Sequence, residues 1–539
     1  MSRQMPLSRV RPSGGTGGTG ASGGPGGPGE AAVADQLPPV VVGAGPAGVR
    51  AVQTLVAHGL RPVLVDEAAR GGGQIYRQPP PGFQRPARTL YGFEAGRARD
   101  LHACLEGLLP QIDHRPDTLV WHALPAGVDP ALPPATGQLS LLHGPSAAAR
   151  TLPFSQLLLA TGATDRVLPV PGWTLPGVFS LGGAQVALKA QACAIGRRVV
   201  FIGTGPLLYL VAWQYLKAGV QVAAVLDQSR LADQLAALPA LAAQPAVLAK
   251  GAWFVARLKA AGVPVHRGAR VLRLLGDDAR SQGPATGVPG VSPAGPPAIP
   301  SGNGDRLRAV EWTDDPGGQR IRRIDCDGAA LGHGLRSETQ LADLLGCRFD
   351  WQPLHRAWLP MRRADGASSV SGVWLAGDGA GILGADAAEW AGERAALGLL
   401  AERGIAIDPR RARALDERLA RATRFRQGLE RAFPFPEDWA ARTPDDTVIC
   451  RCERLSAGDL RQAAAATGAD ELGRLKALSR LGMGRCQGRM CASAAAELLA
   501  QACGRPVPQV GRLRAQAPVK PIPIHLHLQP GEPPAGAGA

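Results

Sequence analysis

The chain has few aromatic residues, which make up only 4% of its 539 residues. This scarcity argues against the stacking platforms on which proteins bind single-stranded nucleic acid. The net charge is +15 and the sequence pI is about 10.0, but the sequence has no basic run longer than a few residues and no nucleic-acid-binding motif. The composition therefore predicts an arginine-rich soluble protein with an acidic partner and without nucleic acid.

A membrane-spanning segment is also missing. The most hydrophobic window, 199–216, contains Gly203-Thr204-Gly205-Pro206, which fits a buried strand, turn and helix better than a membrane span. Residues 1–38 are rich in Gly, Pro, Ser and Thr and lack the apolar core of a secretory signal, so we expect them to be disordered. The sequence predicts a cytoplasmic protein without a transmembrane segment, and it leaves open a peripheral contact with the inner face of the membrane.

The first organised stretch is a run of valines that meets a glycine-rich turn. Residues 40–42 are followed by Gly43-Ala44-Gly45-Pro46-Ala47-Gly48 and by an amphipathic helix expected at 49–58. In this pattern the first glycine makes the tight turn, the second lets backbone approach a pyrophosphate, and the third lets helix and strand pack closely. A second strand, 63–65, ends in Asp66-Glu67, and Glu67 stands near the spacing, ~20 residues, at which a carboxylate binds the ribose of a dinucleotide.

Three further segments carry glycine in similar positions. The loop after Glu67 contains Gly73 and Gln74; a glycine cluster there lets backbone pass close to a flat or phosphorylated ligand, and a flexible loop is the alternative. The strand 157–159 runs into Ala160-Thr161-Gly162, and the strand 373–375 runs into Gly377-Asp378 before a helix at 385–400. The last two segments repeat the strand-to-glycine-turn pattern of the first.

A second strand, turn and helix begins at residue 199. Its turn reads Gly203-Thr204-Gly205-Pro206-Leu207-Leu208, so Leu208 stands where the third glycine belongs and should push the helix away from the strand. A strand at 222–226 ends in Asp227, with Arg230 close by but no arginine directly after the acid. The sequence predicts the fold here and gives a poor nicotinamide signal, so NAD(P) and a structural or regulatory nucleotide-like site both stay open. Further on, His333 is expected in a turn, as a catalytic base or, more commonly for a turn histidine, solvated.

The nine cysteines are an odd number, and four of them form two close pairs, Cys450 with Cys452 and Cys486 with Cys491. In a long chain without a secretory signal, this pattern indicates metal ligation rather than a disulfide framework. Two thiolate pairs suit a tetrahedral zinc ion or a [2Fe–2S] cluster, and four reduced core cysteines are a further alternative. The spacing departs from the C-x₂-C pairs of zinc ribbons, which favours the cluster.

Small and basic residues surround the second cysteine pair. Gly482, Gly484 and Gly488 would let backbone N–H groups approach the sulfides of a cluster and tune its potential. Arg485 and Arg489 would offset the negative charge of four thiolates. Both features fit an electron-carrying cluster.

Two dinucleotide folds, the second inserted into the first, with Ala-Thr-Gly and Gly-Asp signatures, resemble the two-dinucleotide-fold flavoprotein family over roughly residues 39–400. The resemblance implies FAD in the first fold. The residues it places at FAD are Gly43, Gly45, Pro46, Ala47, Gly48, Glu67, Gly73, Gln74, Thr161, Gly162, Gly377 and Asp378. Disulfide reductases of this family carry a close cysteine pair facing the flavin, whereas here Cys193 stands alone, so disulfide reductase chemistry is not expected.

The segment 447–505 resembles the bacterioferritin-associated-ferredoxin-like [2Fe–2S] domain, with Cys450, Cys452, Cys486 and Cys491 as the implied ligands. Its Gly-Met-Gly-Arg-Cys-Gln-Gly-Arg-Met-Cys run, the Gly-Gly-Gln-Ile-Tyr-Arg loop and the Gly-Thr-Gly-Pro-Leu-Leu turn are similar to those of the A subunits of heteromeric amine dehydrogenases. These include opine oxidases, hydrogen cyanide synthase, and proline or hydroxyproline dehydrogenases.

The expected architecture is therefore α/β, with two nested Rossmann-like dinucleotide-binding domains of three-layer type and a small C-terminal helical [2Fe–2S] domain. The expected division is a disordered N-terminus 1–38, an FAD-binding domain 39–165 and 326–402, an inserted NAD(P)-binding-like domain 166–325 with a low-complexity loop 277–306, a connector 403–446, a [2Fe–2S] domain 447–505 and a tail 506–539.

The resemblance implies an FAD-dependent oxidoreductase subunit. A partner flavoprotein subunit, amino-acid-oxidase-like, would oxidise an amino acid, imino acid or opine at its C–N bond, and electrons would pass through this chain to a quinone or carrier protein. Two alternatives stay open: a stand-alone NAD(P)H-dependent flavin and iron–sulfur reductase, and a zinc-stabilised assembly protein without redox function.

Overall fold

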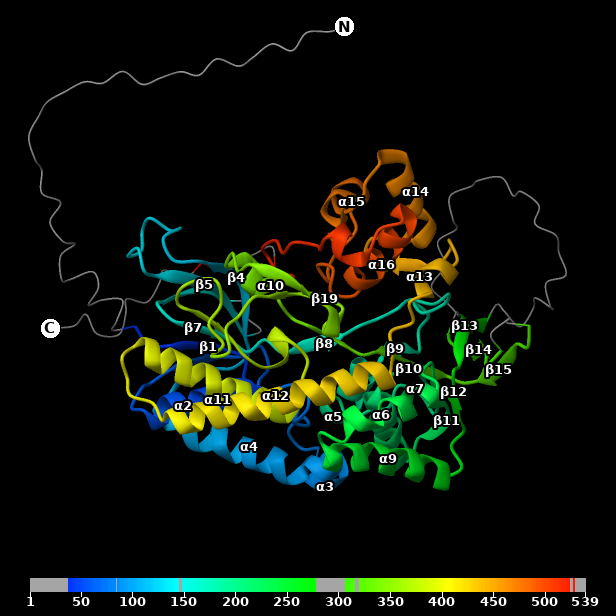
Figure 1. Cartoon of the computed structure of the whole chain (residues 1–539), viewed down its shortest axis with the longest axis horizontal. Helices are drawn as coiled ribbons and strands as arrows, with labels where there is room; N and C mark the ends of the chain where they lie inside the picture. The colour runs from blue at the N-terminus through cyan, green and yellow to red at the C-terminus, as the bar shows by residue number, and fades with distance from the viewer. Residues whose placement is uncertain are drawn as a thin grey trace, which may run out of the picture.

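The computed structural model describes residues 37–83, 85–144, 148–277, 306–315, 319–523 and 527–528. Residues 1–36, 278–305 and 529–539, which hold most of the expected disordered N-terminus, the low-complexity loop and the end of the tail, lie outside the described residues. Figure 1 shows two halves that each contain a sheet, and a small helical unit above them. The helices of that unit are α14 (Ala457–Thr467), α15 (Leu472–Ser479) and α16 (Ala492–Cys503).

A five-stranded parallel sheet forms the core of the first half. Its strands stand in the order β20 (Val373–Leu375), β7 (Leu157–Leu159), β1 (Val40–Val42), β2 (Val63–Val65) and β3 (Asp113–Arg115). Successive side chains of a strand face opposite layers. Val41 packs with residues of the helices on one face, whereas Val40 and Val42 pack with residues of an antiparallel sheet on the other. These layers consist of α2 (Pro46–Ala57), α4 (Ala95–Leu108) and α11 (Ala385–Glu402), and of β4 (Thr118–Leu124), β5 (Gly137–His143) and β6 (Ala148–Phe154).

The second half repeats this plan. Its parallel sheet has the order β12 (Val265–Arg267), β11 (Gln221–Asp227), β10 (Arg198–Thr204), β16 (Gly328–His333) and β9 (Val178–Ser180). Helices α5 (Leu181–Ala190), α6 (Pro206–Lys217) and α9 (Pro245–Ala260) cover one face, and the antiparallel strands β13 (Arg270–Leu275), β14 (Ala309–Thr313) and β15 (Arg322–Asp325) cover the other. The nested α/β fold is confirmed. The chain does not return at residue 326, however, because β16 still pairs with β10.

Two short strands carry the chain between the halves. β8 (Ala163–Asp165) follows β7, and it pairs antiparallel with β17 (Leu335–Ser337), which follows β16. The chain thus leaves the first half beside the point at which it returns. After β17 come α10 (Gln340–Leu344), β18 (Phe349–Gln352) and β19 (Ala357–Pro360). The segment from β17 to α10 therefore begins where the two halves meet.

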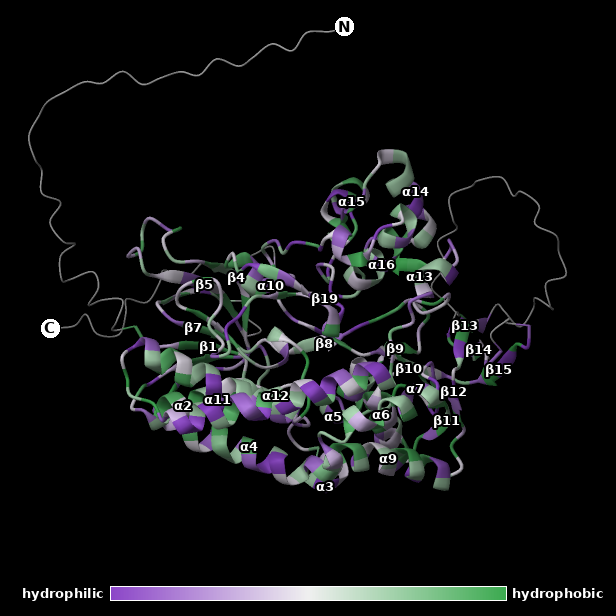
Figure 2. Cartoon of the chain, in the orientation of Figure 1, coloured by the Kyte–Doolittle hydropathy of each residue, from purple (hydrophilic) through white to green (hydrophobic). Residues whose placement is uncertain are grey.

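A long helix, α12 (Pro409–Ala432), runs along both halves (Figure 1). Asp408 caps it by accepting from the N–H of Arg410 at 2.8 Å, and Pro409 occupies its first turn. It packs against α11 of the first half and against α7 (Leu231–Ala236) and α8 (Leu238–Leu241) of the second. Figure 2 shows many hydrophilic residues along α12, as expected for a connector with one face on the protein.

The small C-terminal unit has an apolar core of its own, which includes Leu460, Leu475 and Leu499. Ser456 begins α14 with a capping box, and Gly504 ends α16 in the left-handed conformation. These local signals explain why so short a segment folds into three helices. Across the described part of the chain, no helix combines the length and apolar character needed to cross a membrane.

Candidate functional site

The first glycine turn places backbone at the mouth of a large cavity. Gly43 has a φ of +108°, and a Cβ on it would lie 2.3 Å from the carbonyl oxygen of Ala160. A Cβ on Gly48 would lie 1.7 Å from the Gly43 carbonyl oxygen. Gly45 differs, because the nearest atom to its Cβ would be the Gly73 Cα at 3.6 Å. Two of these glycines are thus required by the fold, and Gly45 leaves space free at the N-terminus of α2, where N–H groups and the helix dipole favour an anion.

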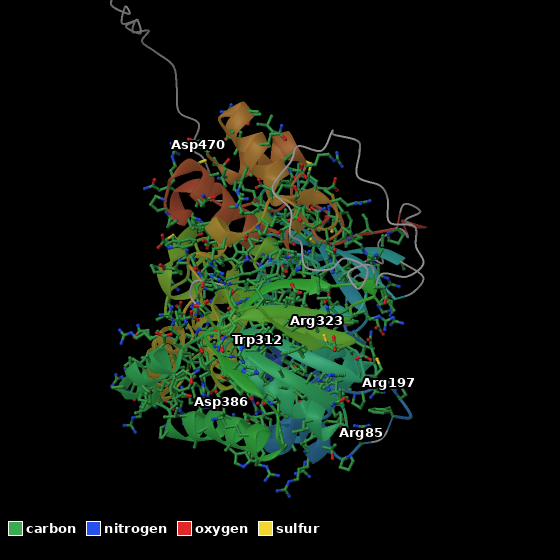
Figure 3. The ribbon with its side chains drawn as sticks, turned by 90° about the vertical axis from the view of Figure 1, so that its right-hand side faces the viewer. Arg85, Arg197, Trp312, Arg323, Asp386 and Asp470 are labelled. Carbon is green, nitrogen blue, oxygen red and sulfur yellow. The ribbon has the colours of Figure 1, made fainter. Side chains whose placement is uncertain are left out.

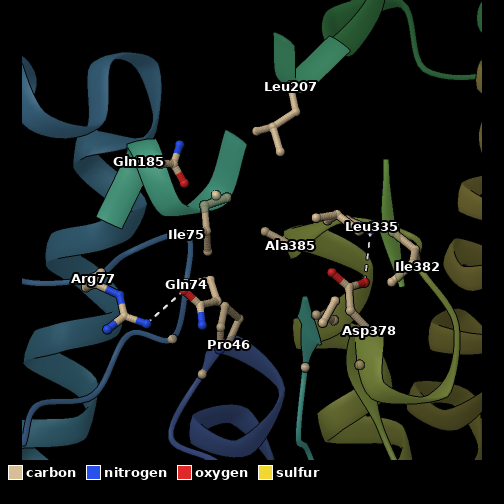
Figure 4. A pocket seen from close by; sticks show the side chains of 18 of the residues that line it. Pro46, Gln74, Ile75, Arg77, Gln185, Leu207, Leu335, Asp378, Ile382 and Ala385 are labelled. Atoms are coloured by element: carbon tan, nitrogen blue, oxygen red, sulfur yellow. Dashed lines mark hydrogen bonds between the residues drawn. The ribbon is translucent and has the colours of Figure 1, made fainter. Parts of the chain in front are cut away.

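The loop that follows Glu67 packs against this turn. Gly73 has a φ of +60°, and a Cβ on it would lie 2.9 Å from the Gly45 Cα. Gln74 accepts a hydrogen bond from Arg77 at 2.7 Å, and Figure 4 shows both residues near Pro46 at the edge of the cavity. The close approach explains why glycine is needed in this loop. The alternative of a flexible loop does not agree with this close packing.

The ends of β7 and β20 supply the opposite wall. Asp378 accepts from the N–H groups of Leu383 at 3.1 Å and Gly384 at 3.3 Å. Burial raises the pKa of the Asp378 carboxyl, and these two N–H groups oppose that rise. The Thr161 hydroxyl donates to the Glu338 carbonyl at 2.6 Å. Thr161 and Asp378 therefore meet at one edge of the sheet, as their strand-ending positions imply.

Beside the first glycine turn, the two acids Asp66 and Glu67 have different roles. Asp66 accepts from the N–H groups of Ala44 and, at 2.7 Å, Ala68, so it holds the turn together. Glu67 is exposed and pairs with Lys520 from the C-terminal tail. Neither the role of Asp66 nor the contact of Lys520 was predicted. The position of Asp66 at the end of β2 could have indicated its role, whereas no local signal places Lys520 beside Glu67.

These residues enclose a single cavity of about 1810 Å³. It exceeds the roughly 300–1000 Å³ of sites for drug-sized ligands, so it has room for a dinucleotide. All the residues expected at FAD except Gly48 line it. The cavity also extends to the second glycine turn, to α12, and to Arg485, Arg489 and Met490 beside the cysteines.

The acid of the second fold is occupied by its own chain. Asp227 is fully buried and accepts from the Tyr209 hydroxyl at 2.5 Å and from the Ser229 N–H and hydroxyl, both at 2.9 Å. Leu208, in the place of the third glycine, is also fully buried, in the apolar cluster that contains Phe201. Asp227 is absent from the residues that line the cavity. The carboxylate at the ribose-binding position of this fold thus stabilises the fold through hydrogen bonds within the chain.

His333 is buried rather than solvated, so the expectation of a solvated turn histidine is wrong. It ends β16 in register with Thr204 and is 3% exposed. Neither ring nitrogen has a hydrogen-bond partner among the described residues. Burial, together with the charge of Arg166, lowers the pKa of His333 to about 4. The ring is therefore neutral at pH 7, and it lines the cavity.

The four expected metal ligands lie together in the small unit. The Cys491 thiol is in hydrogen-bond contact with the Cys450 and Cys486 thiols, and Cys486 with Cys452. Contact with Cys491 lowers the pKa of Cys450 to about 6 and that of Cys486 to about 5. A Cβ on Gly484 would lie 2.4 Å from the Cys452 Cβ. Hydrogen bonds with the Cys450 and Cys486 thiols raise the pKa of Cys491. Burial raises the pKa of Cys452, and the four thiols thus titrate as one group.

Backbone N–H groups point at this thiol group, as the glycine content predicts. The N–H of Gly482 approaches Cys450, and those of Gly488 and Met490 approach Cys486. Within the described ranges, no group of three or more His, Cys, Asp or Glu side chains meets the geometry of a site for one metal ion. A [2Fe–2S] cluster is held by four cysteines, two thiolates on each iron.

One segment touches both the cavity and the cysteine loop. Its Arg336 donates to the Arg489 carbonyl at 2.8 Å, and its Gln340 donates to the Gln487 carbonyl at 2.8 Å. On its other side, Ser337 donates to the Asp378 carbonyl at 2.6 Å. We call residues 336–340 the bridging segment. It fixes the cysteine loop against the wall of the cavity.

Comparison with known proteins agrees with this geometry. Residues 38–392 match the pyridine nucleotide-disulphide oxidoreductase family, and residues 448–501 match the BFD-like [2Fe-2S] binding domain. The chain is similar to the A subunit of opine oxidase from Agrobacterium tumefaciens (strain Ach5), with 33% identity over 90% of both chains. It is also similar to the HcnB subunit of hydrogen cyanide synthase from Pseudomonas aeruginosa, with 35% identity over 90% of this chain and 97% of that protein. The crystal structure of L-proline dehydrogenase from P. horikoshii shares the fold, with a TM-score of 0.61, 17% identity, and coverage of 90% of this chain and 78% of that one.

Proposed function

The chain belongs to the pyridine nucleotide-disulphide oxidoreductase family and is a flavin oxidoreductase with FAD and a [2Fe–2S] cluster as cofactors, and we propose that it is the electron-relaying subunit of a heteromeric enzyme. The enzyme would oxidise an amino acid, imino acid or opine at a C–N bond. One observation carries the proposal: Arg489 and Met490, directly before the ligand cysteine Cys491, line the same cavity as Gly45. The relatives' names describe subunits of an oxidase and a synthase.

We propose that FAD lies along the first glycine turn. The N–H groups at the start of α2, beyond Gly45, would receive its pyrophosphate. Glu67 would accept from the ribose hydroxyls, and Asp378 and Thr161 would meet the ribityl chain and close the site. The free space beside Gly45 supports this placement. The cofactors supply the electron transfer itself, and the chain's residues hold them near each other.

Cys450, Cys452, Cys486 and Cys491 are the proposed ligands of the cluster. The approach of the Gly482 and Gly488 N–H groups to the sulfurs supports that role, because such hydrogen bonds set cluster potentials. The bridging segment would fix the distance between cluster and flavin. Analysis of metal and acid-labile sulfide separates this proposal from a zinc-stabilised assembly protein.

A stand-alone NAD(P)H reductase is disfavoured by one observation, the engagement of Asp227 with Tyr209 and Ser229. With the Gln234 amide, which donates to the same carboxylate at 3.4 Å, these donors occupy its roughly four acceptor sites and leave none for a ribose hydroxyl. Stopped-flow mixing of the FAD-loaded protein with NADH or NADPH should therefore reduce the flavin no faster than buffer does. Rapid bleaching by either nicotinamide would replace the proposed function by the reductase.

The proposal includes an amino-acid-oxidase-like partner subunit and an acceptor, a quinone or a carrier protein. It places the complex in the cytoplasm or at the inner face of the membrane. Co-expression with an amino-acid-oxidase-like flavoprotein subunit tests it: we expect a stable complex that reduces an artificial acceptor with an amino acid, imino acid or opine. A complex that fails to form, or that turns over none of these amines, would contradict the proposal.

A further inference from the structure

Lys189 is a buried cation whose charge no acid of the described chain neutralises. It lies in the last turn of α5, is 3% exposed, and donates to the Ile75 carbonyl at 3.0 Å. Its ammonium also lies 5.8 Å from the centre of the Tyr91 ring. Burial lowers the pKa of Lys189 to about 8, and the charged neighbour that acts on it is another cation, Arg77. The ammonium thus stays protonated at pH 7 in a place that penalises positive charge.

This cation lies in the wall of the cofactor cavity. Gln185 and Lys189, on α5 of the second half, line the cavity together with Gln74 and Ile75 of the first half. Figure 4 shows Gln185, Ile75 and Gln74 facing one opening above Pro46. Lys189 therefore stands where the inserted fold closes on the loop that covers the first glycine turn.

A buried charge is costly unless an opposite charge compensates it. Neither the Ile75 carbonyl nor the Tyr91 ring supplies a full negative charge. A lysine in this situation inside a cavity is a candidate for ligand electrostatics. The ligand expected here is a flavin, and taking up two electrons and one proton leaves a single negative charge on the ring. In the proposed function, those electrons come from the C–N bond that the partner subunit oxidises, and the proton comes from water.

We propose that Lys189 stabilises the negative charge that the bound flavin acquires on reduction, and so sets the flavin potential. The inference rests on the proposed placement of FAD in this cavity. Lys189 is then a positioning and electrostatic residue for the flavin. Lys189 belongs to the inserted fold. This fold would therefore act on the flavin even though Asp227, the acid at its own ribose-binding position, is bonded to Tyr209 and Ser229.

The competing role is structural, since Lys189 also ties α5 to the Ile75 carbonyl. Lys189→Gln separates the two roles, because glutamine keeps a hydrogen-bond donor and loses the charge. Lys189→Arg keeps both. Lys217→Met is the matched control, because Lys217 lines the same cavity but is exposed, where water screens its charge.

The test is the dissociation constant of the apo-protein for oxidised FAD and, separately, for dithionite-reduced FAD. Lys189→Gln should weaken binding of reduced FAD about tenfold more than binding of oxidised FAD, since a unit charge close by in a partly buried site acts with this strength or more. Tenfold corresponds to 29.6 mV for a two-electron couple. Lys189→Arg and Lys217→Met should leave the ratio as in the wild type.

A structural role would weaken both redox forms equally, and an unchanged ratio in Lys189→Gln would overturn the inference. The ratio stays measurable when binding is weak, because each constant is obtained by titration of added cofactor. Wild-type protein that binds neither form would instead refute the placement of FAD. The two failures are therefore distinguishable.

Discussion

Glu338 and Arg489 form a largely buried ion pair between the two proposed cofactor sites, with the Arg489 Nε 2.6 Å from the Glu338 Oε2 and side chains that are 13% and 11% exposed, respectively. The carbonyl of the same Glu338 accepts from Thr161. Burial alone would raise the pKa of Glu338, but the guanidinium groups of Arg489 and Arg336 hold it below its ordinary value. One residue of the bridging segment thus contacts the flavin wall by its backbone and the cysteine loop by its side chain.

Glu338→Gln should loosen the small C-terminal unit from the first half. The substitution leaves Arg489 buried without an anion, which costs about 3–5 kcal/mol. We expect a lower temperature of unfolding and faster protease cleavage between α12 and β21 (Val448–Cys450).

The matched control is Asp470→Asn, which removes an exposed pair with Arg505, both side chains being 46% exposed. Figure 3 shows Asp470 at the outer end of the small unit. Exposed pairs contribute at most about 1 kcal/mol, so this variant should resemble the wild type. Equal effects of the two substitutions would show that Glu338 is not a bridge.

Gly45→Val should yield a folded protein without FAD. A side chain at Gly45 meets no atom of the chain closer than 3.6 Å at its Cβ, so it enters the space proposed for the pyrophosphate. Gly48→Ala should instead fail to fold, because its Cβ would lie 1.7 Å from the Gly43 oxygen. Flavin absorbance and circular dichroism of both variants check this. Normal flavin content in Gly45→Val would contradict the placement of FAD.

Cys486→Ser should remove the cluster and spare the flavin. Arg485, Arg489 and Met490 of the cysteine loop line the cavity, but the proposed FAD ligands all lie outside the small unit. Iron and acid-labile sulfide should be lost while the flavin-to-protein ratio stays unchanged. Cys503→Ser, outside the thiol group, should keep both cofactors. Loss of flavin together with iron would show that the two sites depend on each other.

Acid should destabilise the wild type partly through His333. Its folded pKa of about 4 lies below the ordinary 6.5, so the unfolded chain binds a proton that the folded chain excludes. The stabilisation is full well above pH 6.5 and is lost as the pH falls toward 4, by about 2 kcal/mol between about pH 8 and about pH 5. Denaturant unfolding at both pH values should show this loss in the wild type but not in His333→Gln. Identical pH dependence in the two proteins would contradict the burial of a neutral ring.

The helices, strands and glycine turns could be predicted because the residues that determine them lie close together in the sequence. Glycine at position 48 is required by a contact within one strand, turn and helix, since its Cβ would meet the Gly43 oxygen, whereas a Cβ on Gly43 would meet Ala160 after β7, a contact that the local motif does not contain. Likewise, the two cysteines of each pair lie close together in the sequence. These features are therefore readable without the structure, and the nested α/β fold was predicted from them.

The contacts between distant segments were not predictable in the same way. Lys520 reaches Glu67 across 453 positions, and Glu338 reaches Arg489 across 151. The burial of His333 depends on β16 belonging to the second sheet. The chain therefore returns to the first half later than at residue 326, where the return was expected. Tyr209, which occupies Asp227, lies only 18 positions away, but a tyrosine on a helix carries no pattern that reveals its hydroxyl partner.

Electron paramagnetic resonance after photoreduction of the purified protein tests the shared housing of flavin and cluster most directly. We predict FAD, iron and acid-labile sulfide in the sample, and a signal of a reduced [2Fe–2S] cluster once the flavin has been bleached by light. A protein that contains zinc and no sulfide, or a bleached flavin that leaves the cluster silent, would contradict the relay.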